Sequence, residues 1–306
     1  MSGSFRRWAL LTVMTFAAAS LTAAAAPAGQ ELQKEFEQAL RDFDEAHQIQ
    51  NERPDRARQL FRAAAQSFSS IAAAGVVNGR LEFNIGNCHL QAGDVGRAIL
   101  HYLRAQRLIP RDPLLADNLA VAHSRCLTPI EPTRQSEFFK SVFFWHHQTA
   151  AATRFRVGLV MYIAVWVLLS ARSLIRRRWI TGSADSSPQR SRALGLLIVV
   201  CAIVAGACGM SVAAQRWSDR NAPEAVVTAM DVVVYKGPGT GYQRQFEQPL
   251  QPGVECTIRE RRGTWWNIEL VDGNAGWIQA GDAELISEET EALSQVLRPR
   301  NVASVG

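Results

Sequence analysis

Five cysteines and six histidines are the side chains of this 306-residue chain best suited to nucleophilic or metal chemistry. Their spacing indicates neither. The chain has no Cys-x-x-Cys pair, no histidine beside a serine or cysteine in a nucleophile motif, and no glycine-rich phosphate loop. His146 and His147 are adjacent, and neighbouring helical residues point to different faces, so we expect no metal site there. We predict no catalytic residue, no metal and no cofactor.

The cysteines leave two interpretations open. Cys88 and Cys126 lie in neighbouring predicted helices and can pair in an oxidising compartment, or both can remain free. Cys201 and Cys208 are seven residues apart in an apolar stretch, where packing is a better explanation than reactivity. Net charge adds little, because much of the formal +5 comes from arginines beside apolar segments and no basic run interleaves with aromatics elsewhere. We therefore expect no nucleic-acid partner.

Two apolar stretches organise the chain. Val157–Ile175 contains one charge, Arg172, and Ala193–Gln215 contains none. As helices they reach about 28 and 34 Å, enough for a hydrocarbon core of roughly 30 Å. We assign transmembrane helices to residues 155–175 and 193–214, with the lipid bilayer as a partner. The alternative is a pair of buried core helices.

The linker over residues 176–192 is strongly basic and holds one acid, Asp185. By the positive-inside rule it is cytoplasmic, so the parts before and after the helix pair lie outside the cytoplasm. Arg172 is then an interfacial anchor. The arginines that set this topology are Arg176, Arg177, Arg178, Arg190 and Arg192.

Residues 1–28 have the pattern of a secretory signal peptide: Arg6 and Arg7, an apolar run, and then small residues that offer Ala-x-Ala cleavage sites. This agrees with the location that the arginines predict. The alternative is an uncleaved third membrane helix.

Residues 29–126 read as helical throughout. One set of residues falls at offsets of 0, 12, 16, 19 and 24 and resembles the 34-residue tetratricopeptide repeat. Small residues let two helices approach, an aromatic ring fills the space between repeats, and a proline ends the second helix. The signature residues are Gly86, Ala98, Tyr102, Ala105 and Pro110.

The resemblance implies two full repeats and a capping helix, with one or three repeats as alternatives. Phe36–Gln50 and Pro54–Ala74 form the upstream pair, and Asp112 caps a helix over Pro113–Cys126. Such repeats bind extended peptides on a concave face. The resemblance makes four residues candidates for that face, and the alternative is that they are simply hydrated: Asn84, Asn87, Arg104 and Asn118.

Residues 127–154 form a proline-containing linker and an interfacial segment whose aromatic cluster, Phe138 to Trp145, suits the headgroup region. Residues 287–306 are polar and are expected to be a flexible tail.

Residues 222–286 differ from the preceding helical segments and consist of short β-rich runs, which we predict to be strands. The runs are Ala225–Thr228, Val232–Tyr235, Glu255–Arg261, Trp265–Val271 and Asn274–Ile278. With the turns Gly237-Pro238-Gly239 and Asp272-Gly273 and the triplet Gly276-Trp277-Ile278, this segment resembles the bacterial SH3 domain, a small all-β barrel.

Alternation turns Trp266, Ile268 and Leu270 toward the core and Trp265 outward. Tyr235 and Tyr242 can join Trp265 in a ligand groove. The alternative is that Trp265 packs under a loop.

The order of these parts resembles the BatE-like proteins of the bacterial aerotolerance operon. The resemblance implies a multi-domain protein of the bacterial inner membrane that acts as a non-enzymatic scaffold. Its partners would be membrane proteins with von Willebrand factor A domains and a MoxR-type ATPase system. The alternative is an adaptor that binds peptidoglycan and recruits a wall-remodelling enzyme. The stretches left unassigned are too short for a catalytic domain.

Overall fold

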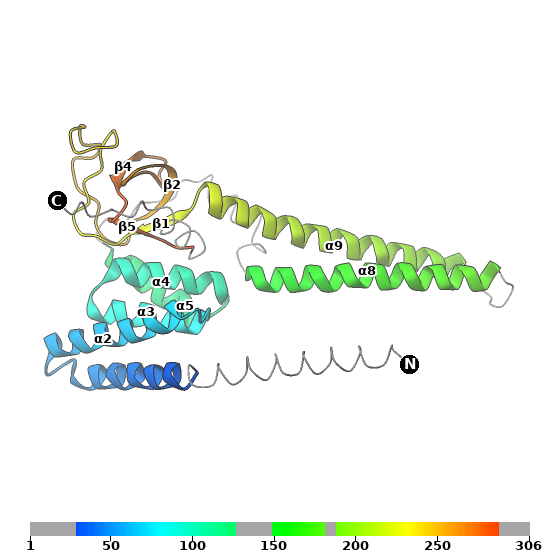
Figure 1. The fold of residues 1–306 in the computed structure, drawn as a ribbon, viewed down its shortest axis with the longest axis horizontal. Helices are drawn as coiled ribbons and strands as arrows, with labels where there is room; N and C mark the ends of the chain where they lie inside the picture. Colours follow the sequence, from blue (N-terminus) through cyan, green and yellow to red (C-terminus); the bar gives the residue numbers. More distant parts are fainter. Residues whose placement is uncertain (1–28, 127–148, 181–187, 288–306) are drawn as a thin grey trace, which may run out of the picture. The chain divides into compact units, whose positions relative to one another are not determined.

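The computed structural model describes residues 29–126, 149–180 and 188–287, with the backbone alone for 176–180 and 188–191 (Figure 1). The predictions for the signal peptide, the interfacial aromatic cluster, the basic linker before Arg192 and the tail lie outside these residues or their described side chains. The described chain is mostly helical with one small antiparallel sheet. It divides into two compact units, one ending at Asp94 and one starting at Val95.

The first unit contains a helix over residues 29–49, α2 (Pro54–Ala73) and α3 (Gly79–Ala92). Pro54 begins α2, where its missing N–H costs nothing. Asn78 caps α3 by accepting the N–H of Arg80, and Gly93 ends it with a left-handed φ of 84°. The three helices bury a common apolar core. Its members include Ala39, Ala64, Phe68, Leu81, Ile85 and Cys88.

The second unit begins with the packed helices α4 (Val95–Leu108) and α5 (Pro113–Arg125). Asp112 caps α5 as predicted, because its Oδ1 accepts the N–H groups of Leu114 and Leu115. Ala98, Tyr102 and Ala105 of α4 are completely buried. This face of α4 therefore combines two small side chains with one large aromatic ring in the core.

Five strands form the sheet, in the spatial order β4-β3-β2-β1-β5 with every pair antiparallel. They are β1 (Glu224–Val227), β2 (Glu255–Arg262), β3 (Trp265–Leu270), β4 (Ala275–Gln279) and β5 (Ala283–Leu285). The predicted alternation along β3 is confirmed: Trp266, Ile268 and Leu270 are buried in the core and Trp265 is partly exposed.

The predicted strand Val232–Tyr235 is wrong. This stretch makes only isolated bridges, from Val232 to Leu250 and from Tyr235 to Arg244 and Trp277. Val232 and Val234 still bury their side chains in the core. An alternating apolar pattern indicates that every second side chain is buried. Here the side chains are buried although the backbone forms no continuous ladder of hydrogen bonds.

Two long antiparallel helices connect α5 to the sheet: α8 (Ala151–Ile180) and α9 (Pro188–Asn221). Both are long and apolar enough to span a membrane. Only 6% and 11% of their apolar windows are buried, which argues against core helices of a soluble protein. Both extend beyond the predicted spans, because the polar flanks continue the helices.

Candidate binding sites

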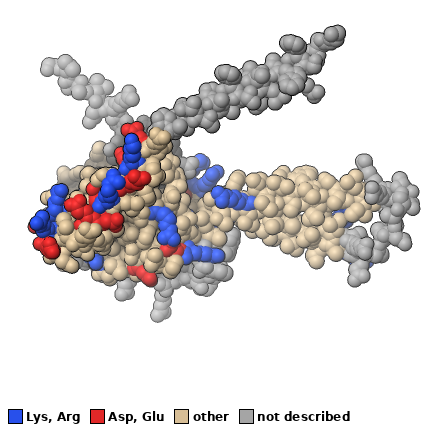
Figure 2. Space-filling model, turned by 90° about the horizontal axis from the view of Figure 1, so that it is seen from below, with Lys and Arg blue, Asp and Glu red and all other residues tan. Residues whose placement is uncertain are grey.

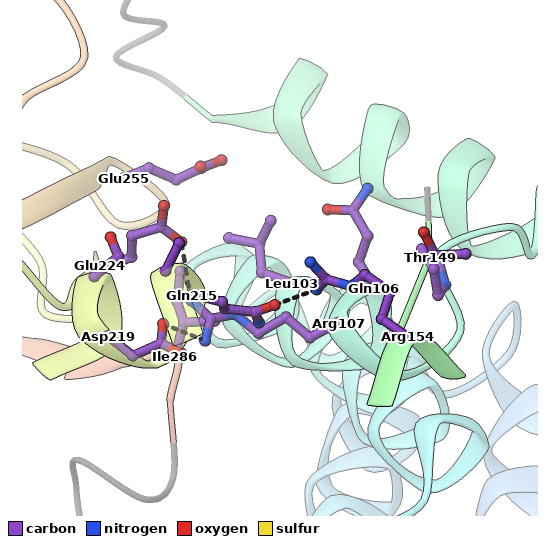
Figure 3. Close-up of a pocket in the computed structure, with 13 residues that line it drawn as sticks. Leu103, Gln106, Arg107, Thr149, Arg154, Gln215, Asp219, Glu224, Glu255 and Ile286 are labelled. Carbon is purple, nitrogen blue, oxygen red and sulfur yellow. Dashed lines mark hydrogen bonds and ion pairs between the residues drawn. The ribbon is translucent and has the colours of Figure 1, made fainter. Parts of the chain in front are cut away.

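A polar cavity of about 610 Å³ lies in the second unit, where α4, the α8–α9 pair and the sheet meet (Figure 3). We call it the junction cavity. Its wall combines two guanidinium groups with three carboxylates. The charged lining residues are Arg107, Arg154, Asp219, Glu224 and Glu255.

Arg107 spans the junction cavity from the last turn of α4. Its Nη1 donates to Oδ1 of Asp219 at 2.9 Å and its Nη2 to Oε2 of Glu224 at 3.0 Å. The side chains of Arg107 and Asp219 are only 25% and 23% exposed, so water and salt screen this pair less than a surface pair. One guanidinium thereby joins α4, the end of α9 and β1.

Arg154 joins the two long helices at the end that lines the junction cavity. It is 5% exposed, its Nη1 donates to the Ser211 hydroxyl at 2.5 Å, and its Nη2 donates to the Gln215 amide oxygen. Its side chain lies between α8 and α9, so it contributes to the packing of the pair.

Helices α4 and α5 are held against the sheet by further polar contacts. Arg104 donates from Nη2 to the backbone oxygen of Leu285 at 2.7 Å, which satisfies a carbonyl on the edge strand β5. His123 Nε2 lies 2.9 Å from Glu255 Oε1. The predicted groove residue Arg104 thus directs its guanidinium toward the sheet.

Two glycines, Gly96 and Gly253, allow α4 and the end of α5 to approach the sheet closely. A Cβ on Gly96 of α4 would lie 2.9 Å from Pro252 Cβ and 2.9 Å from the Val227 carbonyl oxygen. Gly253 has a φ of 101°, and a Cβ there would lie 3.2 Å from the sulfur of Cys126. Cys126 is therefore packed against the sheet.

All five cysteines are free thiols in the structure. Burial raises the pKa of Cys88 and of Cys256 to about 12. Thiolate, the reactive form, is therefore scarce at both positions near neutral pH.

The other predicted groove residues are partly exposed. Asn84 and Asn87 are three residues apart on α3, so they share one face of that helix in the first unit. Asn118 lies on α5 in the second unit. Gly86, one of the signature residues, is buried on α3, and Pro110 follows the end of α4.

A second candidate surface lies on the outer face of the sheet. The Tyr235 and Trp265 rings meet edge to face with centroids 5.6 Å apart. The Arg262 guanidinium lies over the Trp277 ring, 5.4 Å from its centroid. Tyr242 is 54% exposed. We call these five residues the aromatic surface.

Arg262 and Trp277 were missed as site residues. Arg262 is opposite Trp265 across the β2–β3 hairpin, so the hairpin register alone indicates that they are neighbours. The pKa of Arg262 is raised, mainly by its hydrogen bond to Glu260 and to a smaller extent by the Tyr242 hydroxyl. The aromatic surface therefore includes a permanent cation that can pair with a carboxylate or stack on a ring.

Neither a protein-family model, nor a curated protein sequence, nor a solved structure significantly matches this chain. Among the described residues, no group of three or more His, Cys, Asp or Glu side chains is arranged to hold a metal ion.

Proposed function

We propose that this protein is a non-enzymatic scaffold anchored in the bacterial inner membrane, with residues 29–126 and 222–286 outside the cytoplasm. In this proposal residues 29–126 are tetratricopeptide repeats and residues 222–286 are a bacterial SH3 domain. The observation that carries it is the junction cavity. There Arg107 links α4 and the first strand of the sheet to the end of α9, and Arg154 links α9 to α8, both helices of membrane length.

Burial of the signature residues supports the repeat assignment. Gly86, Ala98, Tyr102 and Ala105 are buried, which is the packing role that the repeat pattern requires of them. The small antiparallel sheet, with Trp266 and Ile278 in its core and Trp265 partly exposed, supports the SH3 assignment.

The scaffold would work in a Bat-type envelope or oxidative-stress tolerance complex. Its partners would be membrane proteins with von Willebrand factor A domains and a MoxR-type ATPase system. We assign two surfaces to these partners: the α3 face with Asn84 and Asn87, and the aromatic surface.

The test is affinity purification of the tagged full chain from gently solubilised native membranes, with quantitative mass spectrometry. Deleting the repeats is a poor control, because α4 covers part of the sheet through Gly96 and Arg104. We would compare the double variant Asn84→Ala/Asn87→Ala with Gln66→Ala, an exposed change on α2.

We expect von Willebrand factor A membrane proteins to be enriched with the parent chain and with Gln66→Ala, and to be reduced in the double variant or in Trp265→Ala. If no such protein is enriched with the parent chain, the Bat-type assignment is overturned.

The aromatic surface favours one second candidate, a peptidoglycan-binding adaptor, because the exposed Tyr242 ring and the partly exposed Tyr235 and Trp265 rings can stack on sugars. Purified full-length protein would then sediment with peptidoglycan sacculi, and Trp265→Ala would reduce the bound fraction. Absence of sedimentation by the parent protein would eliminate this candidate.

A further inference from the structure

The end of the α8–α9 pair that joins the basic linker contains an arginine without a protein partner. Arg172 lies inside the apolar window Ala151–Ile175 of α8, and its side chain is exposed. It makes no hydrogen bond or ion pair with the part of the chain that the structure describes. This differs from Arg154 near the start of α8, whose Nη1 and Nη2 donate to Ser211 and Gln215.

Arg172 packs against the neighbouring helix at a glycine. An added Cβ on Gly195 of α9 would lie 3.5 Å from Nη1 of Arg172 and 4.0 Å from its Cζ. Because Gly195 has no side chain, the guanidinium lies beside the backbone of α9. Arg192 is three residues before Gly195, so the two residues share one face of α9, and the Arg192 side chain is also exposed. We call Arg172, Arg192 and Gly195 the arginine site.

The sequence around the arginine site is almost entirely positive in charge. The two helices contain no Asp or Glu in Ala151–Ile175 or in Arg192–Gln215. Residues 176–191, which lie between these ranges, hold four arginines and one acid, Asp185. Figure 2 shows few charged side chains on the face of the helix pair in view. The membrane helices themselves therefore supply no carboxylate for Arg172.

The depth of the arginine site indicates the kind of anion. Arg172 is three residues before Ile175, the end of the apolar window, which is about 4.5 Å along the helix axis. The hydrocarbon core of the bilayer gives way to the headgroup region near that level. A guanidinium can donate two parallel hydrogen bonds to a phosphate, and such a pair is stronger there than in bulk water.

We propose that the arginine site binds the phosphodiester headgroup of an anionic phospholipid in the cytoplasmic leaflet. Arg172 would donate to the phosphate from α8, and Arg192 would supply a second positive charge from α9. Basic pockets between membrane helices on the cytoplasmic side suit such headgroups. A zwitterionic lipid is a poorer ligand, because its own ammonium group offsets the charge of the phosphate. This inference rests on the membrane insertion and topology in the proposed function and adds a lipid partner of defined charge.

The experiment uses the full chain reconstituted in vesicles that contain phosphatidylglycerol and phosphatidylcholine in equal amounts. Extraction with mild detergent and mass spectrometry of the intact complexes measure the ratio of the two lipids that remain bound. Protease protection in the same vesicles first establishes that the parent chain and each variant span the membrane. Arg172→Gln removes the proposed contact. Arg156→Gln is the matched control, since Arg156 is an exposed arginine near the opposite end of α8.

We expect the parent chain to retain phosphatidylglycerol in preference to phosphatidylcholine. Arg172→Gln should lower the retained ratio about fivefold, which corresponds to about 1 kcal/mol for one arginine at an anionic membrane surface. Arg156→Gln should leave the ratio unchanged. Gly195→Leu, which places a side chain against the guanidinium, should also lower it. Gly206→Leu should not, because an added Cβ there meets no atom within 4 Å.

Equal retention of the two lipids by a parent chain that spans the membrane would overturn the inference alone. An unchanged ratio in Arg172→Gln, or an equal loss in Arg156→Gln, would overturn it too, because the lipid would then not bind at Arg172. A parent chain that binds inorganic phosphate in phosphatidylcholine vesicles and shows no preference between the lipids would have a site for a free anion, which also rejects a lipid. A parent chain that does not span the membrane would overturn the proposed function itself.

Discussion

At the scale of single residues, two adjacent tryptophans on β3 have opposite environments. Trp266 is 7% exposed in the core of the sheet, while Trp265 faces outward and meets the Tyr235 ring. The Arg261 guanidinium lies over the outer edge of this core, 5.2 Å from the centroid of the Trp266 ring. A substitution of Trp266 should therefore affect mainly stability, whereas a substitution of Trp265 should affect mainly binding.

We predict that Trp266→Ala lowers the free energy of unfolding by about 3–5 kcal/mol, because it leaves a cavity in the core. Trp265→Ala should cost about 1 kcal/mol, the value of an aromatic pair at a partly exposed site. Denaturant unfolding of the detergent-solubilised full chain, followed by circular dichroism, measures both. Similar losses for the two variants would contradict the assignment of Trp265 to a binding surface.

Asp282, just before β5, gives a pH-dependent prediction. Burial raises the pKa of its carboxyl group, and a backbone hydrogen bond from Gln279 opposes this only in part. A raised folded-state pKa contributes stability that is complete below the unfolded value of about 3.9 and is lost as the pH rises through the folded value.

Asp282→Asn, which is neutral at every pH, should therefore be more stable than the parent chain at pH 7. The difference should shrink toward zero as the pH falls below about 3.9. Thermal unfolding of both proteins at pH 3 and at pH 7 measures it. A difference of the same size at both values would show that the carboxylate charge is not its cause.

At the scale of elements, the contact between α4 and the sheet depends on a missing side chain. Gly96 brings the first turn of α4 against the Val227 carbonyl and Pro252, and backbone atoms there cannot rotate away. Arg104 and Arg107 then fasten the following turns of α4 to the edge strand and to β1.

We predict that Gly96→Ala separates α4 from the sheet and costs about 1–3 kcal/mol, the usual penalty for overpacking. Hydrogen exchange of the β1 amides should become faster. The matched change Gly241→Ala, where an added Cβ meets no atom within 4 Å, should leave exchange in β1 as it is. Unchanged β1 protection in Gly96→Ala would show that the contact does not hold the helix in place.

At the scale of the whole molecule, the proposed function requires a particular topology. Two helices of membrane length should place the basic linker between them on one side of the membrane and residues 29–126 and 222–286 on the other. Reporter fusions in the full chain can test this without knowledge of a partner.

Alkaline phosphatase is active only outside the cytoplasm, so fusions after residues 126 and 287 should be active. A fusion after residue 185 should be inactive, and a green fluorescent protein fusion there should fluoresce. Replacing Arg176, Arg177 and Arg178 with Gln should reduce the difference in phosphatase activity between the fusion after residue 185 and the other two. If the phosphatase fused after residue 185 were active, the topology would be the reverse of the proposed one.

Local features of this chain were predictable from its sequence. The length and composition of α8 and α9, the Asp112 cap and the alternation at Trp265 and Trp266 depend on residues close together in the chain. Short-range rules of length, period and capping are sufficient for these features.

Only the tertiary structure decided what the polar side chains contact. Arg104 turned out to bind a carbonyl of β5, Arg154 lies between two helices, and Val232 is buried without belonging to a strand. Each outcome depends on groups far away in the sequence, which a local pattern does not contain. Length and periodicity predicted the elements, whereas the distances between remote elements determined their contacts, since an arginine pairs with whichever acceptor the fold brings within about 3 Å.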